Sequence, residues 1–109
     1  MKVFWIILSM AFIEFLGDAS LKLYTRGGSK VYLLGGILAY AIMVAALVYI
    51  LKISNVAFMN LEWDGLSTIL ETLLAFLVLH ETLSNSSQYA GMVFIILGVI
   101  LLNRGKVPV

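Results

Sequence analysis

The sequence predicts an all-α membrane protein with four transmembrane helices. Of its 109 residues, 62% are hydrophobic and 12% are charged, whereas about a quarter of the residues in a soluble domain are charged. Four long apolar windows occupy most of the chain, and only short polar connections separate them. No Pro precedes Pro108, so no proline breaks a helix within these windows.

The charge balance and the absence of Cys exclude several classes of protein. Seven basic and six acidic residues give a net charge of +1, which provides no field for binding nucleic acid. Without Cys there is neither a disulfide framework nor a thiolate metal site. A disordered chain, a nucleic-acid-binding protein and an ordinary soluble enzyme are therefore disfavoured.

The apolar windows have the lengths that membrane spans require. A helix needs roughly 20 apolar residues to cross about 30 Å of hydrocarbon. We expect spans at residues 3–21, 31–51, 56–79 and 89–103, which together form one multi-pass domain over residues 1–109. A cleaved signal peptide is the alternative for the first span, but Glu14 and Asp18 fit it poorly.

The first span carries Glu14 near its middle and Asp18 one turn later. With a rise of about 1.5 Å per residue, Glu14 falls near the bilayer midplane, where an acid by default marks a functional site. Gly17 shares this face and leaves room for a neighbouring helix or a ligand. Asp18 either binds a ligand or pairs with Lys22, four residues further on.

The third span carries a polar stripe along one face. Its members are Asn60, Asp64, Ser67, Thr68 and Glu71. A hydrogen-bonded seam between helices would explain Asn60, Ser67 and Thr68, but the two acids favour a water-filled cavity. Ser67 and Glu71 form a possible second polar site there.

Two aromatic residues could complete a cation site. Tyr40 in the second span and Trp63 beside the stripe can each hold a cation over a ring face.

Glu62 lies on the opposite face of its helix, where we expect it to reach the membrane interface or to pair with Lys52.

The fourth span has no acid and carries two glycines on one face. Gly91 and Gly98 are seven residues apart, and small residues in such a stripe allow close helix contact. This helix is therefore predicted to make the dimer contact.

The basic residues near the ends of the spans are almost evenly divided between the two sides of the membrane. One side holds Lys2, Lys52, Arg104 and Lys106, and the other holds Lys22, Arg26 and Lys30. Since Lys and Arg set orientation, this balance predicts weakly biased insertion or insertion in both orientations. The second case allows an antiparallel homodimer.

Catalytic and metal-binding patterns are not evident. His80 is the only His, and no triad-like partner or metal-ligand spacing accompanies it. We expect His80 to end a helix, and we expect no enzymatic activity, no cofactor and no metal.

Several motifs occur in order along essentially the whole chain. They are Glu14 with Gly17 and Lys22, Tyr40, Trp63-x-Gly65, Glu81 with Leu83, and the segment from Gly91 to Gly98-Val99. Together they resemble the small multidrug resistance family of four-span transporters. The resemblance implies an antiparallel, dual-topology homodimer in which two Glu14 side chains share one site for protons or a cationic substrate.

The chain also departs from the pattern of that family. Asn55, Ala57 and Asn60 stand where the family has Pro, Gly and Tyr, and Ser67 replaces a Gly. The missing Tyr removes an aromatic wall. Asp18, Asp64 and Glu71 are gained, which suggests a more polar or more highly charged substrate. An acid between Trp63 and Gly65 resembles the polyamine-exporting branch, which works as a heteromeric pair.

The resulting hypothesis is a proton-coupled antiporter that exports small organic cations across the plasma (inner) membrane. Glu14 would be the shared proton and substrate site. The other expected site residues are Tyr40, Trp63, Asp64, Asn60 and Asp18. The alternatives are a heteromeric polyamine exporter, a non-transporting assembly or regulatory subunit, and a flippase for lipid-linked sugars. The last needs basic residues inside the membrane, and all seven lie at the span ends.

Overall fold

Within residues 2–109, which the computed structural model describes, the chain forms four helices and no strand. They are α1 (Lys2–Thr25), α2 (Lys30–Ile50), α3 (Val56–Leu77) and α4 (Ser86–Leu102). The all-α, four-helix architecture predicted from the sequence is thereby confirmed.

The helices differ in how well they match a membrane span by length and composition. Among the described residues, α1 and α2 are long and apolar enough to cross a membrane, and α4 is apolar but has only 17 residues. α3 has 22 residues but carries three acids. Large apolar side chains such as Val31, Leu34 and Leu38 are exposed on the outer face of α2, as expected for contact with lipid.

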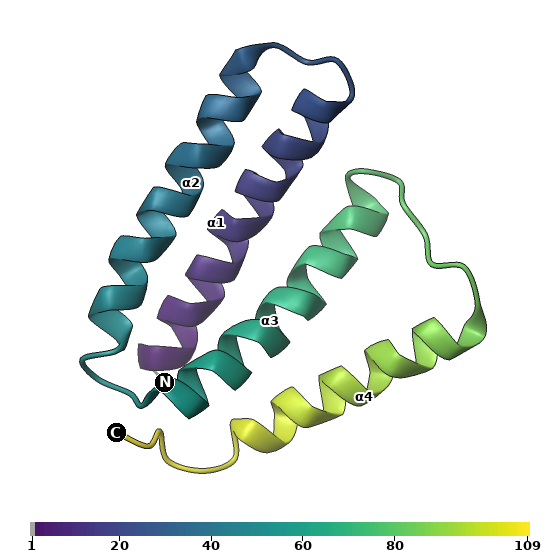
Figure 1. The fold of residues 1–109 in the computed structure, drawn as a ribbon. Coiled ribbons are helices and arrows are strands. Elements are labelled where there is room, and N and C mark those ends of the chain that lie inside the picture. Colours follow the sequence, from purple (N-terminus) through teal and green to yellow (C-terminus); the bar gives the residue numbers. More distant parts are fainter. Residues whose placement is uncertain (1) are drawn as a thin grey trace.

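α1 is the central helix of the arrangement. It lies antiparallel to α2 on one side and packs against α3 on the other, while α4 packs against α3 (Figure 1). α4 approaches α3 at its C-terminal end and diverges from it toward its N-terminal end (Figure 1). The molecule is flat, with extents of 45, 36 and 17 Å along its principal axes.

Two glycines bring α1 and α2 together. A Cβ atom added at Gly36 would lie 2.6 Å from the Cγ of Leu21, and one added at Gly17 would lie 3.0 Å from the Cβ of Ala39. Real Cβ contacts are rarely so short, so a larger residue at either position would push the helices apart. This close approach places α2 side chains within reach of the polar face of α1.

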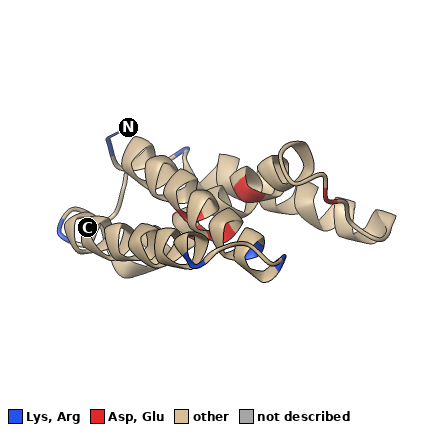
Figure 2. Cartoon of the chain, turned by 90° about the horizontal axis from the view of Figure 1, so that it is seen from above, with Lys and Arg blue, Asp and Glu red and all other residues tan. Residues whose placement is uncertain are grey.

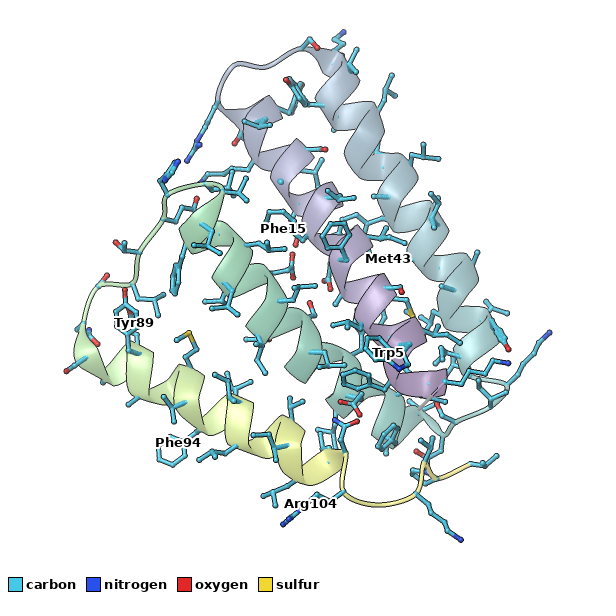
Figure 3. The ribbon with its side chains drawn as sticks, turned by 180° about the vertical axis from the view of Figure 1, so that it is seen from behind. Trp5, Phe15, Met43, Tyr89, Phe94 and Arg104 are labelled. Carbon is cyan, nitrogen blue, oxygen red and sulfur yellow. The ribbon has the colours of Figure 1, made fainter. Side chains whose placement is uncertain are left out.

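The apolar core occupies the end of the molecule that holds the first turns of α1. Ile7, Met10 and Ile50 are almost completely buried there against residues of α3 and Val99 of α4. Phe15 and Met43 point inward between the helices, whereas Phe94 points away from the rest of the chain (Figure 3). Tight packing at this end leaves the polar residues in the middle of the helices and toward the other end.

Polar side chains set the ends of α3 and α4. The Asn55 side chain accepts a hydrogen bond from the Phe58 N–H at 2.8 Å, and the Asn85 side chain accepts one from the Gln88 N–H at 3.1 Å. After α3, His80 adopts a left-handed conformation with φ of 57°. The N–H of Glu81 then donates to the Ala75 carbonyl at 3.1 Å, which turns the chain back.

Candidate functional site

Three carboxylates from two helices meet where α1 packs against α3. One carboxylate oxygen from each of Glu14, Asp18 and Glu71 lies within 4.8 Å of the others, and all three residues are half-buried. Glu14 and Asp18 are four residues apart on α1 and therefore share a face, and Glu71 reaches them from α3. We refer to these three residues as the carboxylate cluster.

Ser67 joins the two helices within the cluster. Its hydroxyl contacts the Oε1 of Glu14 and lies 2.9 Å from the Oε2 of Glu71, and the residue is only 6% exposed. Ser67 and Glu71 were expected to form a possible second polar site. The structure places both of them directly against Glu14.

Tyr40 brings α2 to the cluster. Its hydroxyl donates a hydrogen bond to the Oδ1 of Asp18. A Cβ atom at position 17 would lie 3.2 Å from the Tyr40 ring, so Gly17 provides the space that this ring needs. Tyr40 of α2 thus contacts Asp18, one of the acids that the sequence predicts at the site.

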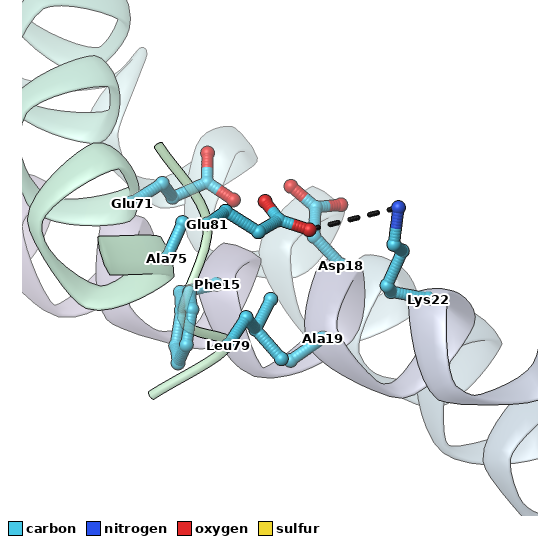
Figure 4. A pocket seen from close by; sticks show the side chains of 8 residues that line it. All are labelled: Phe15, Asp18, Ala19, Lys22, Glu71, Ala75, Leu79 and Glu81. Atoms are coloured by element: carbon cyan, nitrogen blue, oxygen red, sulfur yellow. Dashed lines mark ion pairs between the residues drawn. The ribbon is translucent and has the colours of Figure 1, made fainter. Parts of the chain in front are cut away.

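A pocket of about 210 Å³ opens beside the cluster, between α1 and α3. Asp18 and Glu71 line it on the polar side, and Phe15 and Leu79 form part of its apolar wall (Figure 4). Glu14 does not line it. We refer to this cavity as the α1–α3 pocket.

Opposite charges meet at the edge of the α1–α3 pocket. The Oε2 of Glu81 lies 3.6 Å from the Lys22 Nζ and 3.7 Å from an Arg26 guanidinium nitrogen (Figure 4 shows the Lys22 pair). The sequence suggested that Lys22 pairs with Asp18, but the structure pairs it with Glu81, because the chain turns back after α3. Such half-exposed ion pairs contribute little to stability, typically about 0–1 kcal/mol.

The remaining acids and bases are sorted along the molecule. Lys and Arg lie at the ends of helices and in the segments outside them, whereas Asp and Glu lie within helices apart from the one acid in the α3–α4 connection (Figure 2). In residues 2–109, no Lys or Arg forms an ion pair with a member of the carboxylate cluster. The cluster therefore needs protons or an external cation to neutralise it.

Three residues expected at the site lie elsewhere in the single chain. Asp64 lines a separate groove of about 460 Å³ between α3 and α4, which also includes Gly98. Asn60 is exposed, and Trp63 packs against the apolar core. The indole Nε1 of Trp63 is buried without an acceptor among the described residues.

Glu62 departs from its expected environment. It is 0% exposed, and its Oε1 accepts a hydrogen bond of 2.8 Å from the Asn103 Nδ2. The expected reach to the interface or pairing with Lys52 is therefore wrong, because α4 returns over this face of α3. The second oxygen of Glu62 has no partner within residues 2–109.

The glycines predicted for the dimer contact are not packed within the chain. A Cβ atom added at Gly91 or Gly98 would have no other atom within 4 Å of it, apart from atoms of its own helix and neighbours. Val99, on the same helix, is the residue that packs against α3, at Gly65.

The donor set of the carboxylate cluster is chemically versatile. Carboxylate oxygens can bind a hard metal ion, take up protons or pair with an organic ammonium group. The nearby Tyr40 ring and the apolar wall of the α1–α3 pocket favour a ligand with both charge and hydrocarbon.

Comparison with known proteins identifies one informative relative. Multidrug resistance protein EbrB of Bacillus atrophaeus is 30% identical to this chain over 96 residues, which cover 87% of this chain and 80% of EbrB. No family model and no solved structure matches the chain. The aligned region is long enough to extend over all four helices rather than one motif.

Proposed function

The chain belongs to the small multidrug resistance family, and on this premise we propose that it exports small organic cations in exchange for protons. Its relative EbrB is a multidrug resistance protein. The carboxylate cluster is the observation that carries the proposal. Its residues are half-buried and lie on helices of a membrane protein, where acids are costly unless they have a function.

Electrostatic repulsion within the cluster supplies a coupling mechanism. Two negative charges 4.8 Å apart repel each other by about 3 kcal/mol at an effective dielectric constant of 20, so the cluster favours states that hold protons or a cation. A substrate cation neutralises the charge that protons would otherwise neutralise. Cation binding therefore releases protons, and proton binding expels the cation.

Glu14 is proposed as the carboxylate that both ligands share. It does not line the α1–α3 pocket, and it is contacted by Ser67 from α3. Asp18, held by Tyr40, would orient and attract the substrate. Trp63, Asn60 and Asp64 would line the remainder of the site, which a single chain leaves incomplete.

An antiparallel homodimer in the plasma membrane would complete this site. One chain is only 17 Å thick, whereas a single helix with its side chains is about 10–12 Å in diameter. The cluster residues are only half-buried in one chain, and a second copy would enclose a cation bound there. The even division of Lys and Arg along the sequence favours insertion in both orientations, with all four helices crossing the membrane.

Replacement of Glu14 by Gln tests the proposal. Gln keeps the shape and hydrogen bonding of the side chain but cannot exchange a proton at neutral pH. We expect pH-driven uptake of the organic cation ethidium into proteoliposomes to fall to the level of empty liposomes. Glu62→Gln is the matched control, because Glu62 is buried outside the cluster. Undiminished transport by Glu14→Gln would refute the proposal.

A polyamine exporter working as a heteromeric pair is a second candidate. Three carboxylates within 4.8 Å, with Asp64 exposed in a neighbouring groove, offer more negative charge than a single ammonium group needs. This arrangement favours a polycation whose charges are spaced along an aliphatic chain.

A further inference from the structure

We infer that Ser67 and Glu71 form a proton relay that connects Glu14 to the α1–α3 pocket. The inference rests on the proposed proton-coupled function and adds to it a path for the proton. Ser67 and Glu71 lie four residues apart on α3, so both side chains face α1 from the same side of the helix.

One hydroxyl hydrogen of Ser67 faces two carboxylates. The Ser67 hydroxyl contacts the Oε1 of Glu14 and also lies 2.9 Å from the Oε2 of Glu71. A hydroxyl carries one hydrogen, so it can donate to only one of the two carboxylates. For both contacts to be hydrogen bonds, the other acid must carry a proton and donate it to the Ser67 oxygen. Glu14 and Glu71 thus share one acidic proton through the Ser67 hydroxyl.

Glu71 and Glu14 differ in their access to the α1–α3 pocket. Glu71 lines the α1–α3 pocket, whereas Glu14 does not (Figure 4). Ser67 is only 6% exposed, so water has little access to the hydroxyl itself. A proton that enters through the pocket meets Glu71 before Glu14, and Ser67 is the group in contact with both.

The transfer step balances without any further reactant. The O–H bond of protonated Glu71 breaks as its proton binds the Ser67 oxygen, and the original Ser67 O–H bond breaks as its hydrogen binds ionised Glu14. Ser67 ends as a neutral hydroxyl. One proton has moved inward, and the negative charge has moved from Glu14 to Glu71. The reverse sequence releases the proton when a cation binds at Glu14.

Four other charged or titratable groups surround the relay. They are Asp18 and Lys22 from α1, Tyr40 from α2, and Glu81 from the α3–α4 connection. The Tyr40 hydroxyl is engaged by Asp18, and Lys22 is engaged by Glu81. Neither is therefore paired with Glu14 or Glu71.

Asp18 provides the competing route, because it also lines the pocket and lies within 4.8 Å of Glu14. Direct transfer from Asp18 would not need Ser67. The two routes therefore differ in their dependence on the Ser67 hydroxyl.

A comparison of transport rate and binding tests the relay. In proteoliposomes, Ser67→Ala and Glu71→Gln are expected to slow proton-driven ethidium exchange about a hundredfold, the usual loss when a positioned acid or base is removed. Equilibrium ethidium binding by Ser67→Ala in detergent should stay close to that of the unmodified chain, because this change removes no charge from the cluster. Ser67→Thr restores a hydroxyl and should recover the rate. Thr72→Val is the matched control, because Thr72 lies on the same helix but lines a separate groove toward α4.

A spectroscopic measurement tests the relay without any substrate. The infrared C=O stretching band of protonated carboxyl groups should be reduced equally in Glu14→Gln and Glu71→Gln, because one proton is shared. The double variant should lose no more of the band than either single variant. Additive losses would show two independent acids and would overturn the relay.

The outcomes separate the relay from the proposed function. If Glu14→Gln is inactive while Ser67→Ala and Glu71→Gln exchange at the normal rate, the relay is wrong and the proposed function stands. Slowing by Asp18→Asn alone would assign the path to Asp18 and also overturn the relay. Normal transport by Glu14→Gln would remove the proposed function itself.

Discussion

Asp64 and Ser67 show how strongly one turn of helix separates chemical environments. The two residues are three positions apart on α3, yet Ser67 is buried against α1 and Asp64 is exposed in the groove that faces α4. A cation with a single ammonium group can be satisfied at the carboxylate cluster. A longer polycation could also use Asp64.

Replacement of Asp64 by Asn distinguishes these substrates. If the substrate is a polyamine, Asp64→Asn should weaken spermidine binding about tenfold, the change that accompanies loss of one favourable charge contact. Binding of a monovalent cation such as tetramethylammonium should change little. Competition assays with both ligands on one preparation provide the measurement, and an equal loss for both would count against the polyamine interpretation.

Positions on one helix could be predicted from the sequence, but contacts between helices could not. The four-residue spacing of Glu14 and Asp18 places them on one face regardless of tertiary structure. The contact of Ser67 with Glu14 depends on the axial position of α3 relative to α1. Residue spacing within one helix carries no information on that relative position. The pairing of Glu81 with Lys22 depends likewise on the backbone turn at His80.

At the element scale, α4 is attached to α3 near its C-terminal end. Val99 packs against Gly65, and the Asn103 side chain donates to Glu62 at 2.8 Å while its Nδ2 also lies 2.9 Å from the Val99 carbonyl oxygen. Glu62 lies in an apolar region, so this amide is the only hydrogen-bond partner of its carboxyl group within residues 2–109. The Asn103–Glu62 contact thus adds a buried polar link to the packing of Val99 against Gly65.

Removal of that contact should destabilise the α3–α4 pair. Asn103→Ala leaves the buried carboxyl unsatisfied, which costs about 1–3 kcal/mol, and should lower the thermal unfolding midpoint measured by circular dichroism in detergent. Combining it with Glu62→Leu should recover most of the loss, because neither partner then remains unsatisfied. Ser86→Ala, an exposed site on the same helix, is the control. A double variant less stable than Asn103→Ala would contradict this account.

The apolar windows predict the start of α2 closely, whereas a capping residue determines the start of α4. The expected start at residue 31 differs by one position from that of α2. α4 begins at Ser86 rather than at residue 89, because Asn85 caps it through the Gln88 N–H. Polar first turns of this kind are invisible to hydropathy alone.

At the scale of the whole molecule, the flat shape and the exposed α4 face leave a single chain with much uncovered apolar surface. Phe94, Leu101 and Val93 are each more than half exposed on α4, and the face that carries Gly91 and Gly98 is unpacked. Lipid can cover such a surface, and so can a second copy of the chain. Only the second would enclose the carboxylate cluster from its open side.

A reporter of membrane orientation tests the dual-topology proposal. Fused beyond Val109 through a flexible linker, the reporter should give signal from both sides of the membrane, because Lys and Arg are almost balanced. Replacing both Arg104 and Lys106 by Ala removes two charges from one side and should shift the ratio in favour of one orientation. A single orientation in the unmodified chain would favour a heteromeric pair.

The last residues of the chain are anchored beneath the start of α3. The Asn55 N–H donates a 2.9 Å hydrogen bond to the carbonyl of Pro108, while the Asn55 side chain caps the same helix. The C-terminal segment is therefore hydrogen-bonded to the α2–α3 turn. Shortening the chain to Asn103 would leave that N–H without its acceptor, so trimming the terminus would loosen a helix start about fifty residues away in sequence.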